Sequence, residues 1–561
     1  MIELAVVDSL PNLGLALTIL VTAVLLGSLA AVWYLDRPAG RLGELLRRRF
    51  VMGVPWGTLV VVAFVLAMYL FVQGGLDRWF NPMTIPFRSW SFFYPLGIVT
   101  APFSHRGPGH LLGNLFGTIV LAPIAEYAWG HFPQADGTET FRSWRHNPWI
   151  RALVIFPAAV LGVGLATGLF SLGPIIGFSG VVFAFAGFAI VRYPLTTIVA
   201  VVAGPRTLSL IYGALNNPKM EVTPQPRPPS APWWAEIAIQ GHAIGLLIGV
   251  LLGIGLLWRR GHRPDAWRVW LAVLFFAAEE ALWAVYWFRG NETFVLYRGP
   301  GVALIAILAI VVTLAVTTSD REIIGTVSSR QVWMSVLLLS ASALAGPAIA
   351  TNLLTIGDAS PPDASVQAGD YTVYYAENVE NRMVSVVDID ALGETTAVKT
   401  SGVIVVSERR HIWTQQVSKG RLAFSGRAGV TVGGVGWRER VVAIRRGWSA
   451  VGGGTAYMVW LFPPDGDRRL AFVSNPVTAE PVIGGRNVSV VPSGGAFSIV
   501  VTRNNSTLGI ERIGVLNETD SVHNASAATS VGGLDLLRVE NRIYAIRNGT
   551  VVRVAKKESY N

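Results

Sequence analysis

A serine in the string Gly177-Phe178-Ser179-Gly180 lies where a helix can begin inside an apolar segment. The helix that starts at Ser179 must end near Arg192, because Tyr193-Pro194 disrupts helical backbone. These 14 residues rise only ~21 Å, whereas the hydrocarbon core of a bilayer is ~30 Å thick. The stretch 171–177 would then be non-helical backbone at membrane depth, which is tolerated only where it is buried or lines a water-filled cavity. We therefore expect Ser179 to open a short helix at the floor of an outward-facing cavity.

The chemistry open to Ser179 depends on this position. Unpaired N–H groups and partial positive charge at a helix N-terminus suit a developing oxyanion. The simpler interpretation is a serine that caps its own helix. The string is not the G-x-S-x-G turn of α/β-hydrolases, because position 181 is valine.

A histidine could serve as the base for this serine. His242 lies beside glycines at every fourth position, 241, 245, 249 and 253, which form a smooth helix face. The facing stripe of small residues is expected at Gly180, Ala184 and Gly187. The depth expected for His242, ~12–14 Å inside Trp233-Trp234, is close to the ~10 Å expected for Ser179. The two residues could form a nucleophile–base pair; the alternative is a histidine bonded to a neighbouring helix.

His110 and Asn114 form a third polar cluster inside a span. Their i,i+4 spacing places both side chains on one helix face. Both can donate hydrogen bonds, and two converging donors are what an oxyanion site needs. The alternative is a polar clamp between helices, worth only ~0.6 kcal/mol. His105 precedes the cluster by five residues, near the expected interface.

The composition explains why such residues would lie in a membrane. Of 561 residues, 52% are hydrophobic and 14% are charged, against about 25% charged in soluble domains. These values exclude an ordinary soluble protein, collagen, a coiled coil and a disordered chain. Residues 1–353 carry 23 Lys/Arg and 16 Asp/Glu between long apolar runs, whereas residues 354–561 carry 22 and 19 without such runs. We expect a membrane half followed by a water-soluble half.

Charge and cysteine content exclude further classes. Much of the net charge of +10 lies in short loops, which favours membrane orientation over nucleic-acid binding. The chain has no cysteine, which removes disulfides, thiol catalysis and cysteine zinc sites. No cofactor and no metal are expected.

Ten apolar segments are predicted to be transmembrane helices. They are 11–34, 54–73, 109–129, 150–170, 179–192, 196–215, 235–258, 267–288, 300–318 and 332–353. The first is expected to be a retained span, because it is too long for a signal peptide and follows acidic residues. The arginine-rich loops 35–51 and 258–268 should face the cytoplasm. We therefore expect a multi-pass protein of the cell membrane whose C-terminal half lies on the extracytoplasmic side.

Sequons agree with this orientation. Seven N-x-S/T sequons all fall on the predicted outer side, so we expect a glycoprotein. They are at Asn291, Asn487, Asn504, Asn505, Asn517, Asn524 and Asn548.

The C-terminal half is predicted to be an all-β extracytoplasmic domain. Val/Ile/Thr/Tyr-rich runs recur between turn residues at 402–407, 421–424, 469–473 and 542–546. Asn548-Gly549 predicts a hairpin before the last strand. Arg421-Leu-Ala-Phe and Arg469-Leu-Ala-Phe lie 48 residues apart, which suggests propeller blades; a β-sandwich is the alternative. That this domain binds an outer ligand or protein is a hypothesis.

The order of these motifs resembles that of rhomboid intramembrane serine proteases. That family has a histidine, then H-x-x-x-N in the second core helix, G-x-S-G in the fourth, and a histidine with spaced glycines in the sixth. The matching residues are His105, His110, Asn114, Gly177, Ser179, Gly180, His242, Gly245 and Gly249, with Glu126 and Gly130 at a family glutamate and glycine.

The resemblance covers residues 54–258 and divides the chain into four regions. Residues 1–53 would be an extra transmembrane helix with a basic loop, and 54–258 a six-helix catalytic core. Residues 259–353 would add three transmembrane helices, and 354–561 would be the β-rich domain.

The resemblance implies a Ser179–His242 dyad without an acidic third member. The dyad would cleave single-span or polytopic membrane proteins near the outer face of the bilayer. By resemblance, His110, Asn114 and the Ser179 N–H would bind the oxyanion.

The sequence departs from the family pattern at two places. Leu96-Gly97 replace a Trp-Arg pair of the first outer loop, and Phe183 stands where an aromatic, often tyrosine, stacks on the catalytic histidine. The proline-rich loop 216–232 could cap the cavity or be only a linker.

Two other interpretations remain. One is a catalytically inactive rhomboid-like protein, disfavoured because the serine and the histidine of the dyad are both present. The other is a transporter- or receptor-like protein, with Arg206 and mid-span Glu279 and Glu280 as a conduit. The simpler interpretation is that these glutamates are neutral or paired within the bundle. A conduit leaves the order of the motif residues unexplained.

Overall fold

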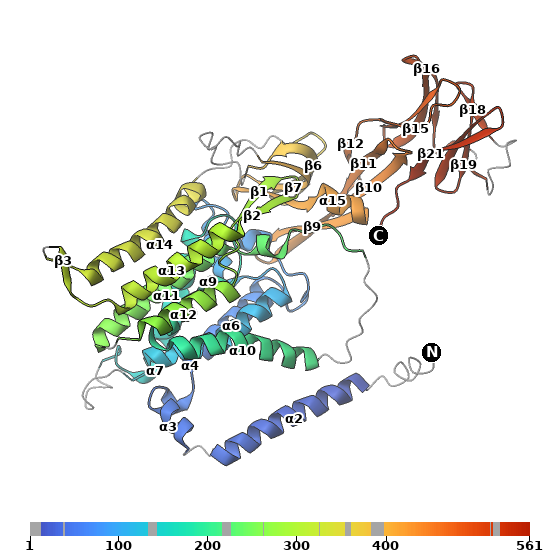
Figure 1. Ribbon diagram of the computed structural model, residues 1–561. Coiled ribbons are helices and arrows are strands. Elements are labelled where there is room, and N and C mark those ends of the chain that lie inside the picture. Colours follow the sequence, from blue (N-terminus) through green and yellow to red (C-terminus); the bar gives the residue numbers. More distant parts are fainter. Residues whose placement is uncertain are drawn as a thin grey trace.

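The computed structural model describes residues 13–36, 40–132, 143–215, 226–261, 263–324, 326–353, 361–382, 398–516, 518–519 and 528–561. A helical bundle is followed by a β domain that lies at one end of it (Figure 1). The helices are α2 (Leu13–Asp36), α3 (Arg41–Arg47), α4 (Trp56–Ala67), α5 (Pro95–Thr100), α6 (Pro108–Trp129), α7 (Pro148–Ile150), α8 (Phe156–Phe170), α9 (Ser179–Arg192), α10 (Pro194–Leu215), α11 (Ile239–Arg260), α12 (Ala266–Glu279), α13 (Arg298–Thr317), α14 (Ser329–Leu353) and α15 (Lys419–Ser425).

The long helices fit a membrane. Within the described residues, six segments are long and apolar enough to cross one: α6, Pro148–Phe170, α10, α11, α13 and α14. Shorter apolar helices are Thr18–Ala31, Trp56–Val72 and Ser179–Arg192. About ten transmembrane helices are therefore not confirmed. The prediction of a 14-residue helix from Ser179 to Arg192 is confirmed.

The predicted span 267–288 is wrong at its end. Helix α12 ends at Glu279, and the chain continues into a hairpin of β1 (Tyr286–Gly290) and β2 (Thr293–Leu296). Glu279 and Glu280 therefore lie at the end of a helix and not in the middle of a span. The apolar run 281–288 led to the prediction of a longer helix. A short apolar run does not distinguish a buried strand from a buried helix.

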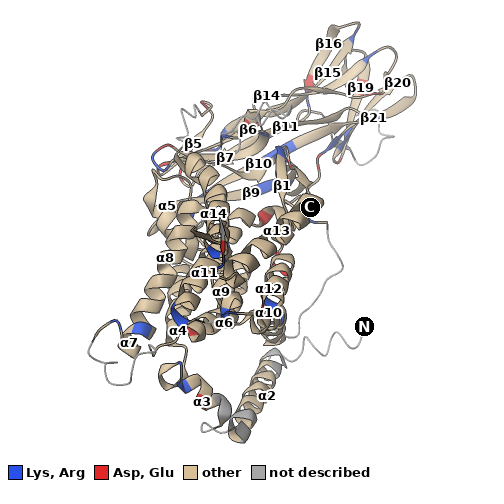
Figure 2. Cartoon of the chain, turned by 60° about the vertical axis from the view of Figure 1, so that its left-hand side comes forward, with Lys and Arg blue, Asp and Glu red and all other residues tan. Residues whose placement is uncertain are grey.

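The bundle has one apolar core with few charges. Buried side chains from α4, α6, α8, α9, α11, α12 and α13 form a single cluster. Figure 2 shows that Lys, Arg, Asp and Glu are sparse along these helices. Helix α9 lies inside, in contact with α6, α8, α10, α11 and α12.

A buried carboxylate holds the start of α4 against the end of α6. Glu126, 0% exposed, accepts hydrogen bonds from Gly57 N and Thr58 N at 2.8 Å and from Thr58 Oγ1 at 2.7 Å. His131 Nδ1 accepts from Val51 N, so its Nε2 carries the hydrogen and donates to Glu126 at 2.6 Å. The carboxylate thus pairs N–H groups that a helix start leaves free.

Replacing Glu126 by alanine should strongly destabilise the bundle. The change leaves four buried donors without their acceptor, and breaking such a buried polar cluster costs roughly 3–5 kcal/mol. Thermal unfolding of the purified protein measures the effect, and Glu126→Gln, which keeps one acceptor oxygen, should lose less. Equal unfolding temperatures for wild type and Glu126→Ala would contradict this role.

The β domain consists of three described sheets. A four-stranded sheet contains β5 (Val366–Ala368), β6 (Tyr371–Glu380), β7 (Lys399–Ser407) and β8 (Ile412–Ser418). A second contains β13 (Val477–Thr478), β14 (Asn487–Ser493), β15 (Ala496–Arg503) and β16 (Ser506–Arg512). The nine-stranded sheet contains β9 (Arg427–Gly434), β10 (Trp437–Ala450), β11 (Gly454–Phe462), β12 (Arg469–Val473), β17 (Glu518–Thr519), β18 (Thr529–Val531), β19 (Leu534–Val539), β20 (Arg542–Arg547) and β21 (Thr550–Lys557). A short two-stranded ribbon, β3 (Glu322–Ile324) with β4 (Val327–Ser328), precedes α14.

The nine-stranded sheet shares one core with each four-stranded sheet. Its β9–β11 part packs with β5–β8, and its β18–β21 part packs with β14 and β15. The long strand β10 contributes to both cores. This is sandwich-like packing, and the propeller repeat is wrong, because Arg421-Leu-Ala-Phe lies in helix α15. The Asn548-Gly549 turn is confirmed, with φ of 48° and 77°.

The loop between α4 and α5 is built into the β domain. Ile85, Trp90 and Tyr94 belong to the same buried cluster as β5–β11. Arg438 donates to the Asn81 carbonyl at 2.9 Å, and Arg410 donates to Tyr94 Oη at 3.3 Å. The β domain is therefore continuous with this loop, although more than 250 residues separate them in the chain.

An ion pair beside this junction makes the stability of the β domain pH-dependent. Arg410 forms two hydrogen bonds to Asp370, at 2.6 and 2.8 Å. Burial alone would raise the pKa of Asp370, but the hydrogen bond and charge of Arg410 outweigh it, so this pKa lies below its usual value. A carboxyl group whose pKa is lowered by folding stabilises the folded protein at pH values above its pKa in the unfolded chain, about 3.9. This stabilisation is lost as the pH falls through the pKa of the folded protein.

We expect unfolding temperatures of the β domain to fall below about pH 4. Asp370→Asn should remove part of this pH dependence and lower stability at neutral pH, because it leaves Arg410 without its carboxylate. Unfolding followed by tryptophan fluorescence from pH 7 to pH 3 tests both effects. Identical pH profiles in wild type and variant would refute the assignment.

Candidate active site

Ser179 is the first residue of α9, and the backbone before it requires glycine. Gly177 has φ +133°, which side-chain-bearing residues rarely adopt. The Gly177 N–H donates to the Ala101 carbonyl at 2.9 Å, which fixes the loop that leads into the helix. Phe178, which caps the helix, makes no side-chain cap bond, and the Ser179 hydroxyl is engaged elsewhere. The structure therefore does not show the serine as a helix cap.

The Ser179 hydroxyl contacts His242. Oγ lies 2.7 Å from Nε2 of His242, within hydrogen-bond reach for a nucleophile and its base. Among the described residues, His242 Nδ1 is buried without a hydrogen-bond partner. The pair therefore has no acidic third member in this part of the chain.

Two aromatic rings hold the imidazole in place. Phe183, one turn after the serine, stacks on His242 with ring centroids 4.2 Å apart and an interplanar angle of 22°. Phe276 of α12 packs edge-on against Phe183 at 5.0 Å. The stacking role expected for Phe183 is what the geometry shows, whereas no sequence pattern pointed to Phe276.

The glycine stripes bring α9 and α11 together. A Cβ added to Gly245 would lie 2.0 Å from the Gly180 carbonyl oxygen, and one at Gly249 would lie 2.0 Å from that of Ala184. A Cβ at Gly187 would lie 2.2 Å from the Leu246 carbonyl oxygen. Such close approach excludes any side chain, so these glycines set the depth at which Ser179 and His242 meet.

His110 and Asn114 converge beside Gly177. A Cβ at Gly177 would lie 2.8 Å from His110 Nε2 and 3.6 Å from Asn114 Nδ2. His110 Nδ1 accepts a long 3.5 Å hydrogen bond from Arg106 N, which leaves the hydrogen on Nε2. Asn114 Nδ2 is buried without a partner in the described residues. The two nitrogens thus lie on the same side of Gly177, two residues before Ser179.

His105 lies behind these donors. Its ring is 0% exposed and packs 5.2 Å from the ring of His110. Its main chain is held by Gln73, which accepts from His105 N at 2.7 Å and donates to its carbonyl at 2.8 Å. His105 therefore supports the position of His110 and does not contact Ser179 or His242 in any bond shown.

Helix α14 also braces the site, through residues that the sequence patterns did not single out. Gln240, two residues before His242, donates to the carbonyls of Phe170 and Leu344 at 2.8 and 2.7 Å and accepts from Leu172 N at 2.8 Å. The buried Asn352 donates to the Ser171 carbonyl at 3.3 Å. Both are polar residues within predicted spans, so the rule that singled out His242 could have found them.

The loop between α4 and α5 is tied to the same segment. Ser89 N donates to the Ile175 carbonyl at 3.2 Å, and Phe92 N donates to the Asn352 carbonyl at 3.0 Å. The β domain, this loop, α14 and the segment before Ser179 therefore form one connected structure. Of the loop 216–232, residues 216–225 lie outside the described residues, so its role as a cap stays a prediction.

Two of the three charged residues that suggested a conduit form an ion pair with each other. Arg206 forms an ion pair with Glu279 between α10 and α12. This contact gives Arg206 a structural partner and removes one support for the conduit. No group of three potential metal ligands occurs within the described ranges.

The long apolar helices and the Ser–His arrangement define a multi-pass membrane protein with an enzyme-like site. Residues 93–259 match the family model described as Rhomboid domain, so this part of the chain is similar to a rhomboid domain. The match includes all nine predicted site residues and ends before α12, so α12–α14 and the β domain lie outside it. No curated protein and no solved structure matches the chain significantly.

Proposed function

We propose that the chain is an intramembrane serine endopeptidase that cleaves transmembrane segments of other membrane proteins. The observation that carries this proposal is the 2.7 Å contact between Ser179 Oγ and His242 Nε2 beside two converging N–H donors. A nucleophile, its base and an oxyanion site are the three parts that acyl transfer needs.

The proposed reaction has two halves. His242 Nε2 takes the Ser179 proton as Oγ attacks the scissile carbonyl carbon. The oxyanion that forms accepts hydrogen bonds from His110 Nε2, Asn114 Nδ2 and the Ser179 backbone N–H. The intermediate collapses, His242 returns the proton to the leaving amine, and an acyl-enzyme remains. Water, deprotonated by His242, then releases the acid and restores Ser179.

The substrate class follows from backbone chemistry. A transmembrane helix has its N–H and C=O groups paired internally, so the protease needs an unwound segment. Helices with glycine, proline or small polar residues near one end unwind at the lowest cost. We place the opening of the site, and the β domain beside it, on the extracytoplasmic side, because arginines gather at the opposite end of the bundle.

Cleavage in proteoliposomes tests the proposal. The full chain is reconstituted with a single-span model substrate that has Gly-Ala-Ser residues near its outer end, and the products are identified by mass spectrometry. We expect one cut near that end, which Ser179→Ala abolishes. Cleavage that persists in Ser179→Ala would refute the site, and no cleavage of several such substrates by folded wild type would favour an inactive rhomboid.

A further inference from the structure

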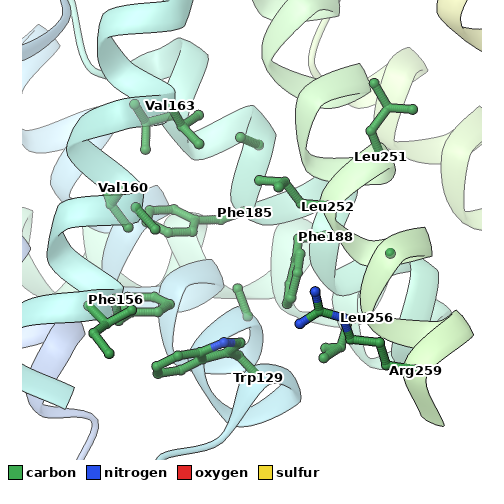
Figure 3. A pocket seen from close by; sticks show the side chains of 16 residues that line it. Trp129, Phe156, Val160, Val163, Phe185, Phe188, Leu251, Leu252, Leu256 and Arg259 are labelled. Carbon is green, nitrogen blue, oxygen red and sulfur yellow. The ribbon is translucent and has the colours of Figure 1, made fainter. Parts of the chain in front are cut away.

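A pocket lies further along α9 from Ser179. It has a volume of about 390 Å³ and lies between α8, α9 and α11, with Trp129 of α6 at one edge (Figure 3). Every lining residue except Arg259 is apolar, aromatic or glycine. Its residues on α9 run from Val181 to Phe188, so it adjoins the helix that carries the nucleophile.

This pocket suits a hydrocarbon chain and not water. A cavity holds water stably only when several polar groups can bond to it, and these walls offer almost none. Leu252, which lines the pocket, is 50% exposed and would face lipid in a membrane. An acyl chain entering between α8 and α11 would cover these apolar walls at no cost in lost hydrogen bonds.

The polar end of the pocket is cationic. Figure 3 shows the Arg259 guanidinium reaching from α11 toward Phe188 and Trp129. Arg151 lies over the Trp129 ring at 3.9 Å, and Arg260 donates to the Trp129 carbonyl. In the described part of the chain, none of these three guanidiniums forms an ion pair with a carboxylate, and Arg151 Nε is buried without a partner. Arg151 and Arg260 donate to backbone carbonyls, whereas Arg259 forms no hydrogen bond or ion pair among the described residues. A guanidinium without a carboxylate partner at a membrane surface is suited to phosphate oxygens.

We propose that this pocket binds an anionic phospholipid from the leaflet at the end of the bundle opposite the β domain. One acyl chain fills the space between Phe156, Phe185 and Leu252, and the phosphate lies at Arg259 and Arg151. A zwitterionic lipid binds less well, because its own cation would approach guanidiniums that no acid offsets. Binding does not depend on whether the protein is a protease.

Native mass spectrometry of the detergent-purified full chain tests this site. Dioleoyl phosphatidylglycerol and dioleoyl phosphatidylcholine are titrated separately, and bound lipid is counted. We expect at least tenfold tighter binding of phosphatidylglycerol to one site. Arg259→Gln should reduce this preference to less than threefold. Arg263→Gln, at an arginine that pairs with Asp320 outside the pocket, is the matched control and should change nothing.

A second variant tests the apolar part. A Cβ at Gly255 meets nothing within 4 Å, so Gly255→Phe can enter the pocket without a backbone clash. It should weaken the binding of both lipids, with the unfolding temperature in detergent unchanged. Equal binding of the two lipids by wild type would overturn the proposal. Phosphatidylglycerol binding that survives Gly255→Phe but not Arg259→Gln would also overturn it, because it would show a surface arginine patch and no acyl site.

Discussion

Replacing His242 by alanine should reduce peptide cleavage by about 10⁴-fold or more, with the fold intact. A serine hydroxyl is a weak nucleophile until a base takes its proton, and His242 Nε2 is the only base within hydrogen-bond reach of Ser179 in the described structure. The measurement is kcat/KM on a model transmembrane substrate, with circular dichroism to verify folding.

The matched control for this variant is another histidine. His146 lies in a turn before α7 and takes part in no side-chain bond shown. His146→Ala should leave kcat/KM within about twofold of wild type. Retention of more than about one tenth of the activity in His242→Ala would show that another group acts as the base.

Replacing Asn114 by alanine should lower kcat by about 10²- to 10³-fold and leave KM nearly unchanged. The buried Nδ2 has no partner in the described resting structure, so its hydrogen bond is available for the oxyanion of the transition state. An interaction made only in the transition state affects kcat and not substrate binding. Steady-state kinetics on the same model substrate separates the two constants.

A structural role for Asn114 would give a different result. If the side chain served only to clamp α6 against α9, its loss would lower the unfolding temperature, and kcat would change little. Asn475→Ala, an exposed amide in the β domain, is the control for general effects of the substitution. A kcat loss below about fivefold would remove Asn114 from the oxyanion site.

The sequence predicted that Ser179 and His242 meet, because membrane depth restricts where polar residues can meet. Ser179 and His242 were matched by distance from the expected interface, and the glycines at 180, 245 and 249 indicated the helices that must touch. Arg192 and Pro194 marked the end of the short helix. These arguments use length and side-chain size, which local sequence carries.

The sequence predicted less where tertiary contacts determine the secondary structure or the packing of distant segments. The end of α12 at Glu279 was missed because the following hairpin is as apolar as a helix. The segment Arg-Leu-Ala-Phe occurs twice and forms a helix at Arg421 but a strand at Arg469. The first copy is helical because Ser418 caps the helix that contains it. The junction of Trp90 and Tyr94 with the β domain has no local signal, since it joins residues far apart in the chain.

That junction connects the β domain physically to the candidate active site. Its core includes side chains of the loop between α4 and α5, and this loop bonds to the segment that leads into Ser179. Regions outside the rhomboid match thus contact the elements of the candidate site, and α12 adds Phe276 behind Phe183. Helices α12 and α14 therefore support the candidate site.

Labelling with a fluorescent fluorophosphonate tests the central claim most directly, because this probe reports an activated serine without a substrate. Wild type, Ser179→Ala and His242→Ala are purified in detergent, verified as folded and labelled side by side. The dyad predicts labelling of wild type that both substitutions abolish. Labelling that persists in Ser179→Ala, or folded wild type that takes no label, would contradict an activated Ser179.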